Sequence, residues 1–361
     1  MKTNCMTSPW WTLSTPSPSP SHQYIDRDSR AVQAERLYGD RVIRFLYSPL
    51  REHAPFLFRA LTGRRMSSLL GFFNYEGFLT GRLADPEEFM KRAGIDPREC
   101  LDPPLRLDTP KKIFERKIRY WECRPTPNDP AAVVSPADSR MLVGSLDENS
   151  SLFIKGKFFD LEELLGKRRW RETFEGGSFA VFRLTPDKYH YNHVPAAGTV
   201  LDVYPLEGHY HACHPEAVVS VVRPFSKNKR VVTVIDTDVP GGTGAGKVAM
   251  IEVVALMIGD IVQCYSEERY NAPLSVGADR FLKRGRPKSL FRPGSSTVVL
   301  LFERDRVRFD DDIVWNMKRP GIDSIYTRGF GQPLTETEIP VRVRIGTACR
   351  SSHTFHKEAD E

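Results

Sequence analysis

The sequence has no apolar run long enough to cross a membrane as a helix. Such a helix needs about 18 consecutive, mostly uncharged apolar residues, and every apolar stretch in the 361 residues is shorter than that. The first residues, Met1 to Cys5, lead into polar and proline-rich sequence without the apolar core of a cleaved secretory signal. We therefore expect an intracellular protein, either cytoplasmic or bound peripherally to a membrane.

Closely spaced cysteines and a strong net charge are lacking too. The six cysteines are scattered and no two form a Cys-x-x-Cys pair, which is typical of reduced thiols rather than of a disulfide framework. Basic residues exceed acidic ones by only six, in a composition that is 40% hydrophobic and 27% charged. These values indicate a globular protein, and the dispersed basic excess does not indicate a nucleic-acid partner.

Composition divides the chain into four regions. Residues 1–29 are rich in serine, threonine and proline, which predicts a disordered leader. Residues 30–108 have apolar side chains at helical spacing. Residues 109–350 consist mainly of β-type runs separated by turn residues, and residues 351–361 form a polar tail. The sequence therefore predicts an α+β protein, with an N-terminal helical layer followed by a β-rich catalytic domain whose clearest elements are strands at 132–134, 179–182, 231–235 and 298–302 and a helix at 160–165.

The predicted helical region has two interpretations. Between residues 40 and 82 it contains seven arginines against three acidic residues, beside aromatic and aliphatic side chains. Basic residues next to an apolar face are typical of a helix that lies on an anionic membrane. The same pattern is found in amphipathic helices that pack inside soluble proteins, and both interpretations stay open.

A glycine-rich segment at residues 241–247 has the spacing of a phosphate-binding loop. That loop requires a hydroxyl residue next, to hold magnesium, and this chain has Val248. The sequence that follows is rich in β-branched residues, as in a strand. We therefore interpret the segment as a glycine-rich hairpin rather than an ATP site.

Five of the nine histidines lie close together in the sequence. With one cysteine, the cluster is His190, His193, His209, His211, Cys213 and His214. Zinc uses such ligands, but their spacing matches no standard zinc pattern, and zinc catalysis also needs a nearby carboxylate base. We therefore expect no metal site. One or two of these histidines are interpreted as acid–base groups and the others as surface or hydrogen-bonded core residues.

The pair Gly294-Ser295 precedes an apolar run and offers a specific reaction. Glycine leaves its carbonyl carbon uncrowded, so the hydroxyl of the next residue can attack it and move the acyl group from nitrogen to oxygen. β-Elimination then cuts the chain and leaves dehydroalanine, which hydrolyses to a pyruvoyl group. Such a ketone is an electron sink like that of pyridoxal cofactors. The reaction would leave residues 1–294 as one chain and residues 295–361 as another.

Five segments together resemble the phosphatidylserine decarboxylase family, over roughly residues 95–310. They occur in the family's order and are similar to its Phe-x-Arg … Arg-Pro, Ser-Pro-Ala-Asp-Gly, Lys-Gly … Leu-Leu-Gly, Tyr-His-Arg-x-His-x-Pro and Gly-Ser-Thr/Ser motifs, at residues 114–125, 134–138, 154–166, 189–198 and 294–298. The histidine and Gly-Ser segments are the specific ones. The resemblance implies an enzyme: a self-processing carboxy-lyase with a covalent pyruvoyl cofactor made from its own chain.

The resemblance also implies roles for individual residues. Asp138, His193 and Ser295 match the triad that drives self-cleavage before the serine. In such a triad the histidine takes the hydroxyl proton and the carboxylate orients the imidazole. His190 matches the histidine assigned to proton transfer during decarboxylation, and an ordinary imidazole pKa near 6.5 suits that task. Ser296 is the alternative pyruvoyl precursor, although only Ser295 follows a glycine carbonyl.

The implied reaction is decarboxylation of phosphatidylserine to phosphatidylethanolamine through a Schiff base, at a membrane surface. Two departures from the motifs matter: Ser139 replaces a glycine, and Tyr191 replaces the arginine between the two histidines. The second removes a cation from the site and keeps open another amine-bearing carboxylate substrate, a free amino acid such as tryptophan. An interpretation of another class is a non-catalytic zinc- or lipid-binding relative. A homodimer of processed two-chain units is one possible assembly.

Overall fold

The computed structural model describes residues 22–35, 80–148, 150, 158–209, 211, 214–220, 223–254, 260–294 and 296–349. Its helices are α5 (Pro86–Arg92), α6 (Pro110–Phe114), α7 (Tyr120–Cys123), α8 (Leu161–Leu165), α9 (Arg168–Phe174), α10 (Pro215–Ser220), α11 (Pro224–Lys227), α12 (Asp311–Lys318) and α13 (Ile325–Phe330), with the 3-10 helices η4 (Pro97–Glu99) and η5 (Pro104–Arg106). Its strands are β1 (Gln23–Asp26), β2 (Val32–Ala34), β3 (Ala132–Val134), β4 (Ser139–Ser145), β5 (Ser178–Leu184), β6 (Tyr191–His193), β7 (Gly198–Leu206), β8 (Arg230–Asp236), β9 (Lys247–Val254), β10 (Ile261–Gln263), β11 (Phe281–Leu282), β12 (Pro287–Phe291), β13 (Ser296–Phe302), β14 (Val307–Phe309), β15 (Thr337–Ile339) and β16 (Arg344–Ala348).

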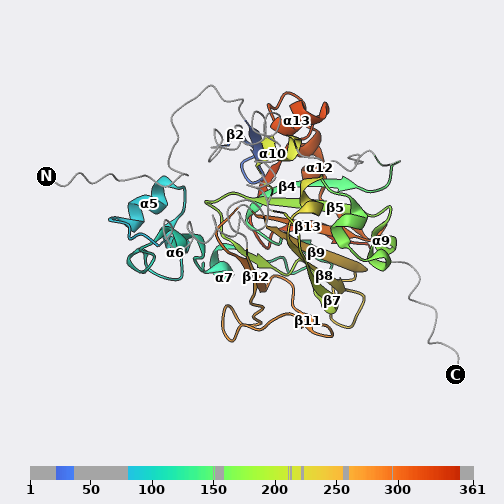
Figure 1. Ribbon diagram of the computed structural model, residues 1–361, viewed down its shortest axis with the longest axis horizontal. Helices are drawn as coiled ribbons and strands as arrows, with labels where there is room; N and C mark the ends of the chain where they lie inside the picture. Colours follow the sequence, from blue (N-terminus) through green and yellow to red (C-terminus); the bar gives the residue numbers. More distant parts are fainter. Residues whose placement is uncertain are drawn as a thin grey trace.

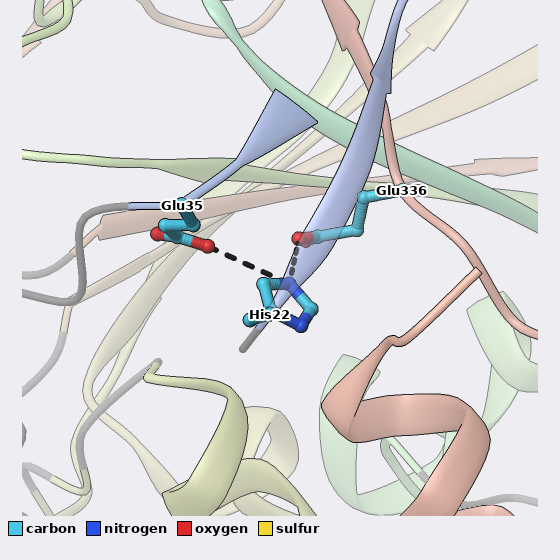
Figure 2. A group of neighbouring side chains, drawn as sticks. All are labelled: His22, Glu35 and Glu336. Carbon is cyan, nitrogen blue, oxygen red and sulfur yellow. Dashed lines mark hydrogen bonds and ion pairs between the residues drawn. The ribbon is translucent and has the colours of Figure 1, made fainter. Parts of the chain in front are cut away.

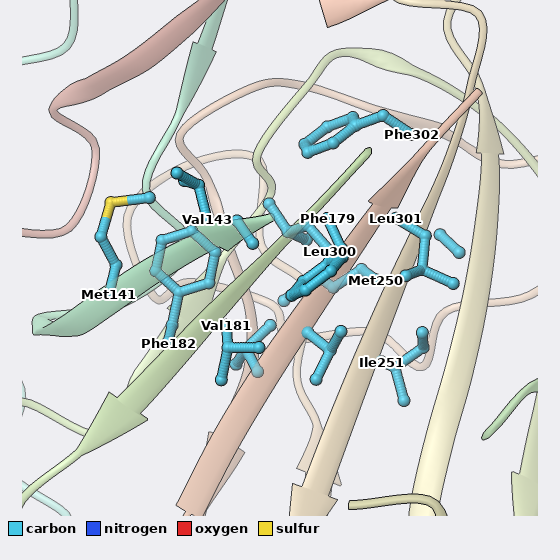
Figure 3. Packing of buried hydrophobic residues seen from close by; sticks show 14 of the residues in the cluster. Met141, Val143, Phe179, Val181, Phe182, Met250, Ile251, Leu300, Leu301 and Phe302 are labelled. Carbon is cyan, nitrogen blue, oxygen red and sulfur yellow. The ribbon is translucent and has the colours of Figure 1, made fainter. Parts of the chain in front are cut away.

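A ten-stranded sheet forms the centre of the molecule (Figure 1). Its strand order is β11-β7-β8-β9-β13-β5-β4-β15-β1-β2, and β13 lies between β9 and β5, antiparallel to both. Every residue of β13 is buried. Figure 3 shows the apolar side chains of these central strands packed together, among them Met141, Phe179, Val181, Phe182, Met250, Ile251, Leu300 and Leu301. The predicted cleavage position therefore lies at the entrance to the central strand of the core.

Two three-stranded sheets accompany the large one, in the orders β10-β12-β6 and β14-β16-β3. In the first of them, β12 pairs with β6 so that Pro287 lies opposite His193. The fully buried Lys288 of β12 donates to the carboxylate of Glu252 on β9, at 2.8 Å. This ion pair holds the small sheet against the large one, and with it β6, which contains His193 and follows directly after His190.

Most elements predicted from the sequence are present. The α+β class is confirmed, and the four predicted strands correspond to β3, β5, β8 and β13. The predicted helix is α8, which begins after the capping carboxylate of Asp160 and ends at Gly166 in the left-handed conformation. The glycine-rich segment joins the antiparallel strands β8 and β9, so the hairpin interpretation is confirmed.

The N-terminal predictions need correction. The end of the predicted disordered leader, residues 22–29, contains β1, which pairs in parallel with β15, and residues 32–34 of the predicted helical layer form β2. No local pattern indicated these strands, because both are short and β15, the partner of β1, is some 300 residues away in the chain. Residues 1–21, most of the predicted helical layer at 36–79, and the polar tail lie outside the described residues. In the described part of the chain, no helix is both long and apolar enough to traverse a bilayer.

Candidate active site

The register between β6 and β12 fixes where the two predicted histidines lie. His193 is opposite Pro287, and the main chain of His190 continues the pairing by accepting from the N–H of Phe291, at 3.0 Å. Asn192, between the histidines, donates to Ser289 on β12 at 3.0 Å. His190 is therefore beside the end of β12, where the chain leaves the small sheet and turns toward the predicted cleavage position.

His190 is completely buried and has a free ring nitrogen. Its Nδ1 lies 2.7 Å from the carbonyl oxygen of Lys188; because a carbonyl only accepts, Nδ1 holds the proton and Nε2 has the lone pair. Nε2 has no hydrogen-bond partner among the described residues. The ring stacks on Phe114 with centroids 3.6 Å apart. Burial, with the nearby Arg116 cation, lowers the pKa of His190 to about 3, so the expected pKa near 6.5 is wrong for this uncut chain.

His193 is buried as well, but both of its ring nitrogens have partners. Nδ1 donates to the carbonyl oxygen of Gly285 at 3.0 Å, and Nε2 accepts from the hydroxyl of Tyr189 at 3.0 Å. The Tyr189 hydroxyl also lies 2.8 Å from that of Tyr270. Burial lowers the pKa of His193 to about 3. The imidazole is thus held neutral and in a single orientation.

Asp138 lies close to His193 but is bonded to other groups. Arg124 donates to its two carboxylate oxygens at 3.0 Å each, and the N–H of Val341 donates to one of them at 2.7 Å. Burial alone would raise the pKa of Asp138, but Arg124 and these hydrogen bonds hold it below its usual value. Asp138 is therefore a carboxylate throughout the neutral pH range.

The predicted triad is only partly assembled. The N–H of His193 donates to the carbonyl oxygen of Pro136 at 2.7 Å, so the segment with Asp138 runs beside β6. No hydrogen bond joins the side chains of Asp138 and His193, because the carbonyl of Gly285 occupies the position of the orienting acceptor. The third predicted member, Ser295, lies outside the described residues.

Ser296, the alternative to Ser295, is the first residue of β13 and is buried. It lies opposite Val254 of β9, and Val298, two residues on, lies opposite Glu252. Residues two apart in a strand share a face of the sheet. Ser296 is therefore on the same face as Glu252, which contacts the small sheet. The register brings the start of β13 to the side of the large sheet where the histidines are.

A second buried group of charged residues lies on the N-terminal side of the large sheet. Figure 2 shows His22 between Glu35 and Glu336, with Nε2 2.9 Å from Glu336. These three side chains have the composition of a metal site. However, Arg183 donates to both carboxylates and Arg140 pairs with Glu35. Because two guanidinium groups already neutralise the two carboxylates, these five residues form an ion-pair cluster, which we call the N-terminal cluster, rather than a cation site.

The zinc interpretation of the histidine segment finds no support in the described residues. His190 and His193 use their ring nitrogens as given above, and the rings of His209 and His211 lie near each other, with centroids 5.7 Å apart. Within the described ranges, the group in Figure 2 is the one set of three metal-ligating side chains that converge. Cys213 lies outside those ranges.

The sequence profile of the phosphatidylserine decarboxylase family matches residues 111–319, more than half of the chain. The chain belongs to the phosphatidylserine decarboxylase family. A phosphatidylserine decarboxylase proenzyme of Fusobacterium nucleatum is 30% identical over 312 residues, covering 84% of this chain and 95% of the relative. One of Ruminiclostridium cellulolyticum is 28% identical, covering 82% and 92%. Phosphatidylserine decarboxylase proenzyme 2 of rice is 31% identical, over 83% of this chain and 42% of that longer protein.

The sequence analysis missed the roles of several residues in the site. Gly285 and Tyr189 hold the two nitrogens of His193, and Arg124 neutralises Asp138. Arg124 and Tyr189 belong to the family motifs, so they could have been singled out as charge and hydrogen-bond partners. Gly285 acts through its main-chain carbonyl, for which a sequence gives no signal.

Proposed function

We propose that this member of the family is a proenzyme that cuts itself before Ser295 and then decarboxylates phosphatidylserine to phosphatidylethanolamine. The observation that carries the proposal is the register of β6 on β12, with the free Nε2 of His190 beside the strand end that leads to the Gly294-Ser295 pair. The proenzyme names of the relatives support the self-cleavage.

The cleavage uses groups of this chain alone. His193 accepts the proton of the Ser295 hydroxyl, whose oxygen attacks the Gly294 carbonyl carbon, and the peptide C–N bond breaks to give an ester and a free amine. Removal of the α-proton expels the Gly294 carboxylate and leaves dehydroalanine. Its enamine tautomerises to an imine, and water releases ammonia, leaving a ketone at the new chain end. Ser296 takes the place of Ser295 if the cut falls one residue later.

Asp138 and Gly285 support His193 in different ways. The Gly285 carbonyl fixes the protonated Nδ1, so that Nε2 is the acceptor; in the uncut chain Nε2 accepts from the Tyr189 hydroxyl, which the Ser295 hydroxyl replaces. Asp138 supplies a buried negative charge near the ring, which favours the imidazolium formed when the proton moves. Its own bonds to Arg124 and Val341 join the segments on both sides of the cut.

The pyruvoyl group supplies the electron sink for decarboxylation when it has been formed. The lone pair of the neutral His190 at Nε2 takes up the proton that the substrate ammonium loses when it becomes a free amine, and the imidazolium gives this proton to the α-carbon after carbon dioxide leaves. Its stacking on Phe114 excludes water from one face of the ring. The substrate is an amphiphile, so the enzyme works peripherally on a membrane surface, with a homodimer of cleaved units as the proposed assembly.

The test is made on the purified full chain. We expect a denaturing gel to show two fragments, residues 1–294 and 295–361, and mass spectrometry to find a blocked, nitrogen-free end on the smaller one. Vesicles with carboxyl-labelled phosphatidylserine should then release labelled carbon dioxide. Ser295→Ala should remain uncut, whereas Ser296→Ala should be cut normally. A wild-type chain that stays in one piece and releases no carbon dioxide contradicts the proposal.

A further inference from the structure

Arg342 is a buried arginine without an acidic partner, close to the predicted histidine pair. Arg342 is 8% exposed, and its Nη1 donates to the carbonyl oxygen of Tyr120 at 2.7 Å. The guanidinium group forms no ion pair with a described carboxylate. Nε is buried and has no hydrogen-bond partner among the described residues. By contrast, the buried guanidinium groups of Arg140 and Arg183 are both paired with carboxylates.

A second unsatisfied polar atom lies next to Arg342. The hydroxyl of Thr126 is buried and has no hydrogen-bond partner in the described part of the chain. A methyl group at Gly285 would lie 3.2 Å from Arg342 Nε and 3.4 Å from Thr126 Oγ1. Arg342 Nε and Thr126 Oγ1 therefore both lie near Gly285, on the side where another residue would have its Cβ atom. Both atoms can donate a hydrogen bond, and neither does so to a described residue.

This pair of atoms adjoins the imidazole of His193. Gly285 is the residue whose carbonyl accepts from His193 Nδ1. The ring of Tyr120 lies between the two side chains: it meets the His193 ring edge-on with centroids 4.8 Å apart, and the Arg342 guanidinium carbon lies 4.8 Å from its centroid. A group bound by Arg342 is therefore one aromatic ring away from His193.

Electrostatics and backbone geometry both indicate that Arg342 is held there for a ligand. A buried cation without an anion is unfavourable, and burial lowers the pKa of Arg342. The residue also has φ of +72°, a conformation that costs side-chain-bearing residues about 1–3 kcal/mol and is concentrated at functional sites. An incoming anion would offset the charge and satisfy Nε.

We propose that Arg342 and Thr126 bind an anionic oxygen of the substrate beside His193. The inference rests on the proposed function and deepens it, because the carboxylate and the phosphodiester of phosphatidylserine both have anionic oxygens. It also accounts for Tyr191, which stands where the family motif has an arginine and packs against Tyr189 and Tyr270. The missing cation is supplied by Arg342, from the far side of the cut, so the complete subsite needs both fragments.

The experiment compares Arg342→Gln and Thr126→Val with the wild type, using phosphatidylserine in detergent micelles. Losing a charge-assisted hydrogen bond should raise KM about 10- to 100-fold for Arg342→Gln and a few-fold for Thr126→Val, with kcat little changed. Arg344→Gln is the matched control, because Arg344 lies on the same segment, is half exposed and pairs with Asp310. Its KM should stay at the wild-type value.

A binding readout that needs no turnover accompanies the kinetics. Inorganic phosphate and acetate are titrated separately into the purified chain, and the thermal midpoint is followed, because a ligand of the folded state raises it. A rise with phosphate that Arg342→Gln abolishes assigns the subsite to the phosphodiester, and the same result with acetate assigns it to the carboxylate.

The outcomes separate this inference from the proposed function. An uncut, inactive wild type contradicts the proposed function, and the anion titration then decides the subsite alone. If Arg342→Gln does not fold or process, Thr126→Val decides, because valine keeps the shape of threonine and lacks only the hydroxyl. A KM within twofold of the wild type in the folded variants, or an anion effect equal in the wild type and Arg342→Gln, overturns the subsite.

Discussion

The N-terminal cluster around Glu336 and the site around His193 are both buried, yet they balance charge differently. In the cluster, Arg183 donates to both Glu35 and Glu336, and His22 donates to the second of them. Each of these side chains is at most 5% exposed. Around His193, the guanidinium of Arg342 donates to a main-chain carbonyl and lies near the Tyr120 ring, and it pairs with no carboxylate among the described residues. Nε2 of His190 has no hydrogen-bond partner in that part of the chain either.

This difference in charge pairing is the one expected between a structural group and the proposed reactive site. Groups that pair as opposite charges already neutralise one another, and they fix the parts of the chain that they join. The cluster joins the segment of β1 and β2 to β15 and β5, which lie far apart in the sequence. Groups that are buried without partners are costly to the fold, so their retention in the histidine site points to a reaction or a ligand.

The largest effect is expected when the free nitrogen of His190 is removed. His190→Gln should lower the rate of decarboxylation about 10²- to 10⁴-fold, the usual contribution of a positioned acid–base group, while the chain is still cut. Rates come from labelled carbon dioxide and cutting from a denaturing gel. His209→Gln is the control, an exposed histidine that should have no effect. Activity within tenfold of the wild type would remove His190 from the reaction.

Breaking the paired cluster should lower stability instead of activity. Arg183→Met leaves two buried carboxylates without their shared cation, which should cost about 3–5 kcal/mol of unfolding free energy. Urea unfolding in a Ser295→Ala, Ser296→Ala background keeps the chain intact. Arg168→Met, at an exposed pair with Glu172, should cost under about 0.5 kcal/mol. Equal losses in the two variants would mean that the cluster is not structural.

The histidine site and the N-terminal cluster should also lose stability at different pH values. The folded pKa of His190 and His193 is about 3, below the unfolded value of about 6.5, so acid protonates the unfolded chain first. Stability should therefore be complete above pH 6.5 and fall toward pH 3, by about 2 kcal/mol per histidine at pH 5. Glu336 has its pKa lowered to about 2, so the cluster loses stability only below about pH 4.5. The unfolding free energy is measured at pH 7.5 and at pH 5. It should fall less between these two values in His193→Gln than in the wild type, and an equal fall in both chains contradicts this account.

The sequence predicted those parts of the molecule that depend on local patterns. Apolar runs such as 298–302 predict strands because such runs occur in buried sheets in general, and a helix was predicted at 160–165, where α8 lies. The family motifs indicated Asp138, His190 and His193. Two of their bonding partners, Arg124 and Tyr189, belong to the same motifs. The other partners could not be predicted, because they depend on which segments the fold brings together. The Gly285 carbonyl and the lone Arg342 acquire their roles only through such contacts.

The smallest change in stability is expected when the charge of Arg342 is removed. This variant gives the most direct comparison between the histidine site and the N-terminal cluster. Methionine has a similar volume and no charge, so Arg342→Met relieves an unpaired buried cation while it leaves the Tyr120 carbonyl without a donor. These terms oppose each other, and the unfolding free energy should change by about 1 kcal/mol or less. Arg183→Met, an identical substitution in the paired cluster, should cost several times more in the same urea assay. A loss of 3 kcal/mol in Arg342→Met would make Arg342 a structural residue like Arg183. A small change, together with a raised KM for phosphatidylserine, means that the charge of Arg342 serves the substrate and not the fold.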